Sequence, residues 1–168
     1  RAREKEKEAE MYVQNIDQIV PSLLNIYNLP GEKPKMKFYR GIEGVKKAYH
    51  DTLLAGETIY AFSDYEKMME AMTFDYMVGY ADERTKRGIQ FYSVGPGGQW
   101  AKKAIDLSKK QKRQMKINDQ LKFDTEINIF GNKVALISFR RPYTAVIVED
   151  RAIAQTLKSI WQAMWEKP

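Results

Sequence analysis

The chain has 168 residues and a mass of 19.6 kDa, which is the length of one domain. It contains no cysteine and a single histidine, His50, so a disulfide scaffold, a thiol nucleophile and a cysteine- or histidine-rich metal centre are excluded. We therefore expect no metal and no cofactor. No apolar run approaches the length of a membrane span, and the charged N-terminus lacks the apolar stretch of a signal peptide. These features predict a cytoplasmic protein without a membrane partner.

The positive charge is concentrated in one segment, residues 102–122. The segment has eight basic and two acidic residues, and this excess equals the net charge of +6 of the whole chain. The basic residues are Lys102, Lys103, Lys109, Lys110, Lys112, Arg113, Lys116 and Lys122. Such a segment can contact the phosphates of a nucleic acid, or it can be a solvated helix and loop. We favour the solvated surface.

Residues 1–30 predict a long connector helix that precedes the globular part. Apolar residues recur there at alternating spacings of three and four, the pattern of a coiled-coil seam, and Pro21 should kink the helix. The seam consists of Ala9, Tyr12, Ile16, Ile19, Leu23 and Ile26. We expect a homodimer through this helix. The alternative is an amphipathic helix that packs on its own domain.

Residues 31–168 predict an α/β domain that follows a turn at residues 28–34. Strands are expected over 36–39, 58–62, 89–94 and 115–117, and helices over 41–54, 65–72, 74–86 and 100–109. Asp64 is a suitable N-cap for the second helix, and Gly88 follows the end of the third.

The last third of the chain predicts a run of strands and a closing helix. Strands over 126–130 and 133–139 flank the tight turn Gly131-Asn132, and a third strand follows at 144–148. Asp150 should cap a helix over 152–165, whose inward residues are expected to be Ile153, Leu157, Ile160, Trp161 and Met164. The element order predicts a mixed β-sheet sandwiched by helices.

Seven polar residues form the predicted ligand site. Asp124, Glu126 and Asn128 alternate on one strand and share a face, where their carboxylates and amide suit the hydroxyl groups of a sugar. The alternative is that this face is the solvent side of a hairpin. Arg40, Ser63, Asp64 and Ser93 follow or end three strands that we expect to be parallel, and ligands of open α/β sheets bind at such ends. A structural role for each of these residues remains the alternative.

No motif predicts catalysis. The sequence has neither a phosphate-binding loop, nor a dinucleotide fingerprint, nor a nucleophile elbow. His50 lies in the middle of a predicted helix, where a surface or interface position is the simplest interpretation. We expect no catalytic residue.

Several segments, in this order, resemble the effector-binding domain of TrmB-like transcriptional regulators. They are VPSLLNIYNL from Val20, KMKFYRGIEGVKKAY from Lys35, IYAFS from Ile59, TEINIFGNKVALISF from Thr125 and TLKSIWQAMWE from Thr156. Regulators of this kind carry an N-terminal winged helix, which this chain lacks. The resemblance implies that DNA is bound only through that missing domain, and that a chain beginning at Arg1 is a piece of a longer protein.

The sensor domain of that family resembles half of a phospholipase D-like unit, whose active members carry H-x-K-x-x-x-x-D and a following Gly-Ser. When the hairpins are aligned, these positions fall on Asp124, Glu126 and Gly131, and on Ser138-Phe139. Every catalytic position is substituted, and the carboxylates would repel an anionic phosphodiester. The resemblance thus implies a non-catalytic scaffold that binds a neutral polyol.

Together these patterns predict a ligand-sensing, dimerising domain of a TrmB-like regulator that binds a sugar or another small polar effector. Two alternatives remain open. One is a diverged phospholipase D-like phosphodiesterase or nuclease, and the other is a nucleic-acid-binding module that uses residues 102–122.

Overall fold

The computed structural model describes residues 34–166 of the chain. The predicted connector helix, its apolar seam and the domain boundary at residue 31 fall outside this range and remain predictions. In the described part, no helix is both long enough and apolar enough to cross a membrane.

Seven strands form one mixed sheet in the order β1-β7-β6-β5-β2-β3-β4. They are β1 (Lys35–Arg40), β2 (Ile59–Phe62), β3 (Phe91–Gly95), β4 (Arg113–Ile117), β5 (Thr125–Phe130), β6 (Lys133–Ser138) and β7 (Thr144–Glu149). The pairs β2–β3 and β3–β4 are parallel, and every other pair is antiparallel. The predicted mixed sheet is confirmed, including the β5–β6 hairpin, in which Gly131 adopts a φ of +55°.

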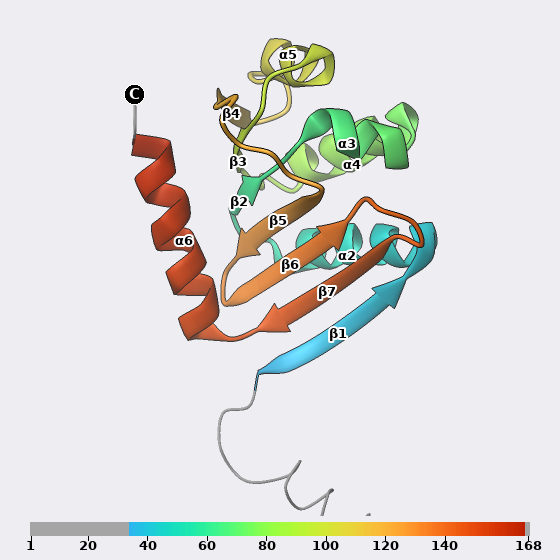
Figure 1. The fold of residues 1–168 in the computed structure, drawn as a ribbon, viewed down its shortest axis with the longest axis vertical. Helices are drawn as coiled ribbons and strands as arrows, with labels where there is room; N and C mark the ends of the chain where they lie inside the picture. Colours follow the sequence, from blue (N-terminus) through green and yellow to red (C-terminus); the bar gives the residue numbers. More distant parts are fainter. Residues whose placement is uncertain (1–33, 167–168) are drawn as a thin grey trace, which may run out of the picture. The chain divides into compact units, whose positions relative to one another are not determined.

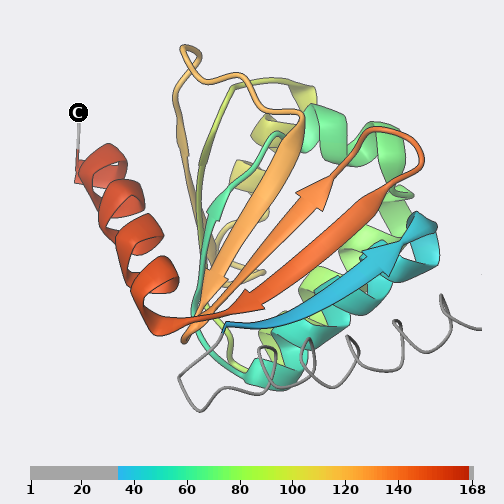
Figure 2. The same cartoon turned by 60° about the horizontal axis from the view of Figure 1, so that its bottom comes forward.

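Helices cover both faces of the sheet (Figure 1, Figure 2). They are α2 (Gly41–Ala55), α3 (Tyr65–Ala71), α4 (Phe74–Lys86), α5 (Gln99–Asp106) and α6 (Arg151–Glu166). Figure 2 shows α6 alone on one side, and the other four helices on the opposite side. The predicted sandwich is therefore confirmed.

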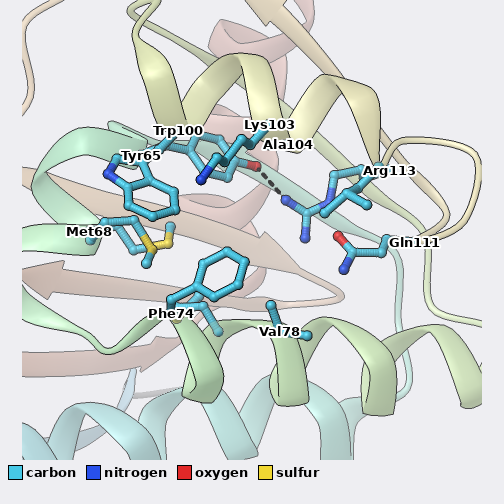
Figure 3. Close-up of a pocket in the computed structure, with 12 residues that line it drawn as sticks. Tyr65, Met68, Phe74, Val78, Trp100, Lys103, Ala104, Gln111 and Arg113 are labelled. Atoms are coloured by element: carbon cyan, nitrogen blue, oxygen red, sulfur yellow. Dashed lines mark hydrogen bonds between the residues drawn. The ribbon is translucent and has the colours of Figure 1, made fainter.

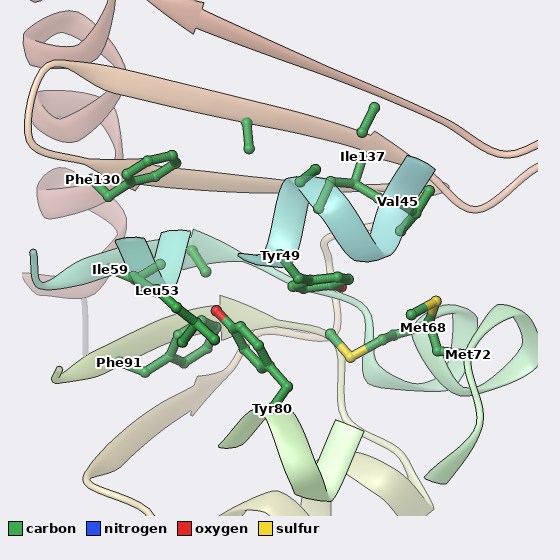
Figure 4. Packing of buried hydrophobic residues seen from close by; sticks show 14 of the residues in the cluster. Val45, Tyr49, Leu53, Ile59, Met68, Met72, Tyr80, Phe91, Phe130 and Ile137 are labelled. Carbon is green, nitrogen blue, oxygen red and sulfur yellow. The ribbon is translucent and has the colours of Figure 1, made fainter. Parts of the chain in front are cut away.

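The core has a part on each face of the sheet. On the side of α2, Val45, Tyr49 and Leu53 are buried against the strands (Figure 4). On the other side, Trp161 of α6 is 2% exposed and donates a hydrogen bond from Nε1 to the carbonyl oxygen of Ala61 at 3.0 Å. Full burial of a large apolar side chain stabilises a fold by roughly 1.5–3 kcal/mol, so both layers hold the sheet in place.

The predicted position of the first strand is wrong in one respect. β1 is an edge strand that pairs antiparallel with β7, whereas the parallel set is β2, β3 and β4. The reason is topological, because the β5–β6–β7 meander lies between β1 and β2. The carboxyl end of β1 therefore points the same way as that of β2 but is separated from it by three strands.

Two of the residues predicted to face inward from α6 do not. Ile153 is 41% exposed and Ile160 is 49% exposed. The helix buries a narrower stripe that includes Ala154 and Trp161, and it packs on β2, β3, β5 and β6. Hence α6 covers only part of its face of the sheet.

Candidate functional site

A buried carboxylate, that of Glu126, lies near the middle of the sheet on β5. It is fully buried and accepts hydrogen bonds from the hydroxyl of Tyr49 on α2 and from Ser63 Oγ, the latter at 3.0 Å. Removal from water raises its pKa from 4.5 to about 7, although hydrogen bonding from Tyr49, Ser63 and Asn128 opposes this shift. At neutral pH the group therefore titrates inside the protein.

Asn128 lies two residues further along β5, on the same face as Glu126. It is fully buried, and neither Nδ2 nor Oδ1 of its amide meets the geometry of a hydrogen bond in the described part of the chain, although the amide lies close enough to the Glu126 carboxylate to lower the pKa of that group. Its cross-strand neighbours are Ala61 and Ala135, which offer no side-chain polar group. An unpaired buried polar group costs about 1–3 kcal/mol, so this amide is ready to bond a polar partner.

The alternative that this face of β5 is solvent-exposed is wrong, because helices cover it. The predicted grouping of Asp124, Glu126 and Asn128 on one face is also wrong for Asp124. Asp124 precedes β5, is exposed, and forms an ion pair with Arg140. Only Glu126 and Asn128 remain on the inner face.

Two serines add their hydroxyl groups to this buried centre, Ser63 directly after β2 and Ser93 in β3. Ser63 bonds Glu126, while the Oγ of the fully buried Ser93 lies 3.3 Å from the hydroxyl of Tyr65. The strands approach closely here, since a Cβ on Gly95 would lie 1.8 Å from the carbonyl oxygen of Ser63. Any other residue at position 95 would push the strands apart and disturb Ser63.

Two further predicted site residues lie elsewhere. Asp64 caps α3, where its Oδ1 accepts the backbone N–H groups of Glu66 and Lys67 at 3.0 and 3.1 Å. Arg40 is exposed at the end of the edge strand β1. Of the seven predicted residues, the structure gathers four in one centre: Ser63, Ser93, Glu126 and Asn128.

Sequence reasoning missed two residues that complete this polar centre. Tyr49 lies on the helix predicted over 41–54, but nothing in the sequence indicated that its hydroxyl reaches Glu126. Arg113 was counted with the basic segment, yet it is half-buried and donates to the hydroxyl of Tyr65 at 3.4 Å. Both contacts join parts of the chain that are far apart in sequence, so no local pattern reports them.

A buried arginine, Arg84 of α4, fixes the backbone beside Arg113. Its guanidinium donates to the carbonyl oxygens of Ile89 and Gln111, each at 2.6 Å, and of Lys112 at 3.3 Å. Burial lowers its pKa to about 10, so it stays charged at neutral pH. This role is structural, and no local sequence pattern indicated it.

Two adjoining cavities lie beside the polar centre. The inner one measures about 20 Å³ and is lined by Glu126, Tyr49 and Arg84 among others. The outer one measures about 50 Å³ and lies between α3, α4 and α5 (Figure 3). Four residues line both cavities, namely Tyr65, Met68, Met77 and Arg113. The inner cavity has room for one water molecule or one hydroxyl group.

No metal centre is present within residues 34–166. That part of the chain contains no group of three or more histidine, aspartate or glutamate residues arranged to hold an ion. The carboxylate of Glu126 is instead surrounded by hydroxyl groups, which suits hydrogen bonding to a neutral partner.

Comparison with known proteins gives a fold but no family. No family model matches the chain, and no curated protein sequence matches it. Among solved structures, it is similar to TrmBL2, an archaeal chromatin protein whose structure shows a novel mode of DNA binding. The TM-score is 0.54 at 18% identity, over 96% of this chain. The chain spans 63% of the length of that protein.

Two other structures share the architecture. NucT from Helicobacter pylori aligns over 80% of this chain and 97% of its own, with a TM-score of 0.57 and 12% identity. Polyphosphate kinase from Porphyromonas gingivalis aligns over 86% of this chain and 29% of its own, with a TM-score of 0.56 and 7% identity. At these identities the likeness shows the fold alone. It is a mixed α/β sandwich that this chain shares with the three proteins.

Proposed function

We propose that this chain is the effector-sensing, dimerising and non-catalytic domain of a TrmB-like transcriptional regulator. The effector is a sugar or another small polar molecule, and DNA is bound through a winged helix that precedes the sensor in the full protein. The fold shared with TrmBL2 and the order of the TrmB-like sequence segments support this proposal.

The observation that carries it is the chemistry of the buried centre. Glu126 and Asn128 present a carboxylate and a buried amide with no well-formed hydrogen bond, which are groups that bind hydroxyls. Neither is the imidazole that phospholipase D-like enzymes use to attack phosphorus, and the only histidine, His50, is exposed on α2. A site of this composition favours binding over turnover.

Sensing requires that binding changes the protein, and the closed centre provides a reason for such a change. The inner cavity admits a single hydroxyl group, so a larger polyol enters only if Tyr65 and Met68 of α3 move. A ligand that stabilises the opened arrangement shifts the population toward it. Movement of α3 is then the first step of the signal.

A thermal-shift screen of the full chain against glucose, maltose and glycerol tests the proposal. A ligand at 100 times its dissociation constant adds about 2.7 kcal/mol of stability, which raises the melting temperature measurably. The Asn128→Leu variant should lose the shift. The matched control Asn132→Leu changes an exposed asparagine of the β5–β6 turn and should keep it. Absence of a shift with every polyol would count against the proposal.

A second candidate is a diverged phosphodiesterase, which the phospholipase D-like fold favours. Asp124, aligned with the catalytic histidine of that superfamily, is exposed and ion-paired, and Glu126 replaces the lysine. We therefore expect no hydrolysis of bis-p-nitrophenyl phosphate above the blank. Turnover that disappears in the Glu126→Gln variant would establish this second function instead.

A further inference from the structure

The outer cavity between α3, α4 and α5 shares four residues with the inner one, but most of its lining lies outside the polar centre. Its wall is rich in methionine and aromatic side chains (Figure 3), and its lining contains no acidic residue. The apolar lining residues include Met68, Met69, Met77, Phe74 and Trp100. At the mouth, Phe74 is 45% exposed and its ring lies 5.4 Å from that of Trp100. An exposed aromatic beside an apolar cavity suggests an apolar ligand.

Two cations border this apolar wall. Lys103 Nζ lies 4.3 Å from the centre of the Trp100 ring, at the side of the mouth. Arg113 lies deeper, beside the buried Gln111 (Figure 3). Within the described residues, Nε of Arg113 is buried without a hydrogen-bond partner, and its only side-chain bond is the one to Tyr65. Both side chains therefore face the cavity as cations without an ion pair in the described part of the chain.

We propose that this cavity binds a small monocarboxylate with an unbranched apolar tail, such as a medium-chain fatty acid. The carboxylate would accept hydrogen bonds from Arg113 and be attracted by Lys103, because charge-assisted hydrogen bonds are the strong ones. The tail would lie among the methionine side chains and across Phe74 and Trp100. The inference goes beyond the proposed function, since it holds whether or not the protein regulates transcription.

The volume of the cavity limits the shape of the apolar tail that the ligand can carry. A volume of about 50 Å³ is well below the 150 Å³ of an engineered cavity that holds benzene, so a ring does not fit in the closed cavity. A thin chain can enter with its carboxylate toward Arg113 while the rest of its alkyl tail covers the aromatic mouth. Methionine side chains adapt readily to such a chain because they are unbranched and flexible.

Isothermal titration of the full chain with octanoate, octanol and octylammonium separates head group from tail. Octanoate should bind at least tenfold more tightly than octylammonium, with octanol between them. In NMR spectra with selectively labelled methionine methyl groups, octanoate should change the chemical shifts of Met68, Met69 and Met77 but not of Met36, which lies on β1. No octanoate binding up to 1 mM, or equal affinity for octanoate and octylammonium, overturns the proposal.

Variants test the place of binding. Arg113→Gln should weaken octanoate at least tenfold, Val78→Trp should fill the cavity and abolish binding, and the exposed control Arg141→Gln should change neither. Lys103→Gln alters an exposed side chain without disturbing the core, and it should weaken octanoate severalfold even if Arg113→Gln destabilises the fold. Unchanged binding in both Val78→Trp and Lys103→Gln would overturn the proposal.

The same titrations keep this inference apart from the proposed sensor. Asn128→Leu, which should abolish polyol binding, lies outside the cavity lining and should leave octanoate affinity unchanged. If polyols fail to bind but octanoate binds in the Arg113-dependent manner described above, the sensor proposal fails and the cavity proposal stands. If polyols bind but octanoate does not, the cavity proposal fails and the sensor proposal stands.

Discussion

The carboxylate of Glu126 makes the stability of the protein depend on pH in a defined direction. Its pKa is about 7 in the folded chain, compared with 4.5 for an ordinary glutamate, so the folded chain binds the proton more tightly. Stability from this group is therefore greatest at low pH and falls as pH rises from about 4.5 through 7. The full change is roughly 3 kcal/mol in the free energy of unfolding.

We predict that Glu126→Gln removes this dependence. The difference in unfolding free energy between variant and wild type should shift in favour of the variant by roughly 2–3 kcal/mol between pH 5 and pH 8. Urea unfolding at the two pH values measures it. The control Asp124→Asn removes an exposed ion pair and should cost less than about 1 kcal/mol at both. A constant difference for Glu126→Gln would show that the carboxylate does not titrate in this range.

For single residues, the sequence predicts which side chains share a face of a strand. It does not predict which elements cover that face. Alternation along β5 correctly placed Glu126 and Asn128 on one face. The burial of that face depends on α2, whose Tyr49 approaches across 77 positions of sequence. Polar residues in a strand ordinarily face water, so their burial could not be read from the local pattern.

Among the elements, α3 depends on a residue that the sequence also proposed as a ligand. Asp64 caps the helix through two backbone N–H groups, and loss of such a cap costs about 0.5–2 kcal/mol. Asp64→Ala should lower the unfolding free energy by about 1 kcal/mol, whereas Asp64→Asn, which can still cap, should stay within about 0.5 kcal/mol. Chemical denaturation measures both. Equal losses in the two variants would show that the carboxylate charge matters more than the cap.

Helices and strands were largely predictable because their signals are local. The range of α4 was predicted exactly from its periodicity and flanking residues, and the β5–β6 hairpin from Gly131-Asn132. The strand that pairs with β1 was not predictable, because pairing between strands distant in sequence depends on the whole sheet. The exposure of Ile153 and Ile160 likewise depends on which strands α6 covers.

For the whole molecule, we predict a dimer that depends on residues 8–27, where the apolar seam would be satisfied by a second chain. Deletion of residues 1–27 should leave a folded monomer, because the sheet begins at Lys35. Light scattering of both chains at tens of micromolar measures this. A full-length monomer contradicts the prediction.

A dimer that survives the deletion would point to a different interface. The part of the sheet that α6 leaves uncovered exposes Met36 at 68% and Phe38 at 66%, beside Leu136 at 40%. Phe38→Glu should then dissociate the shortened dimer. In the monomer that we predict, the same change should leave the mass unaltered.

The charge of the basic segment, residues 102–122, is a property of the whole molecule because it is spread over α5, β4 and the adjoining loops. All seven of its lysines are exposed, which keeps nucleic-acid binding open as a further candidate function. We predict only weak duplex binding without sequence preference, measured by fluorescence anisotropy at physiological salt. Submicromolar affinity that disappears when Lys109 and Lys110 are both changed to glutamate would contradict this.

Native mass spectrometry of the full chain with a polyol tests the central claim most directly, because it reports both binding and stoichiometry. With the polyol that gives the largest thermal shift, or with maltose if none does, we predict one bound molecule per chain, unchanged in mass. The adduct should persist in Asn132→Leu and disappear in Asn128→Leu. Absence of any adduct, or an adduct that persists in Asn128→Leu, would contradict a sensor built on this buried centre.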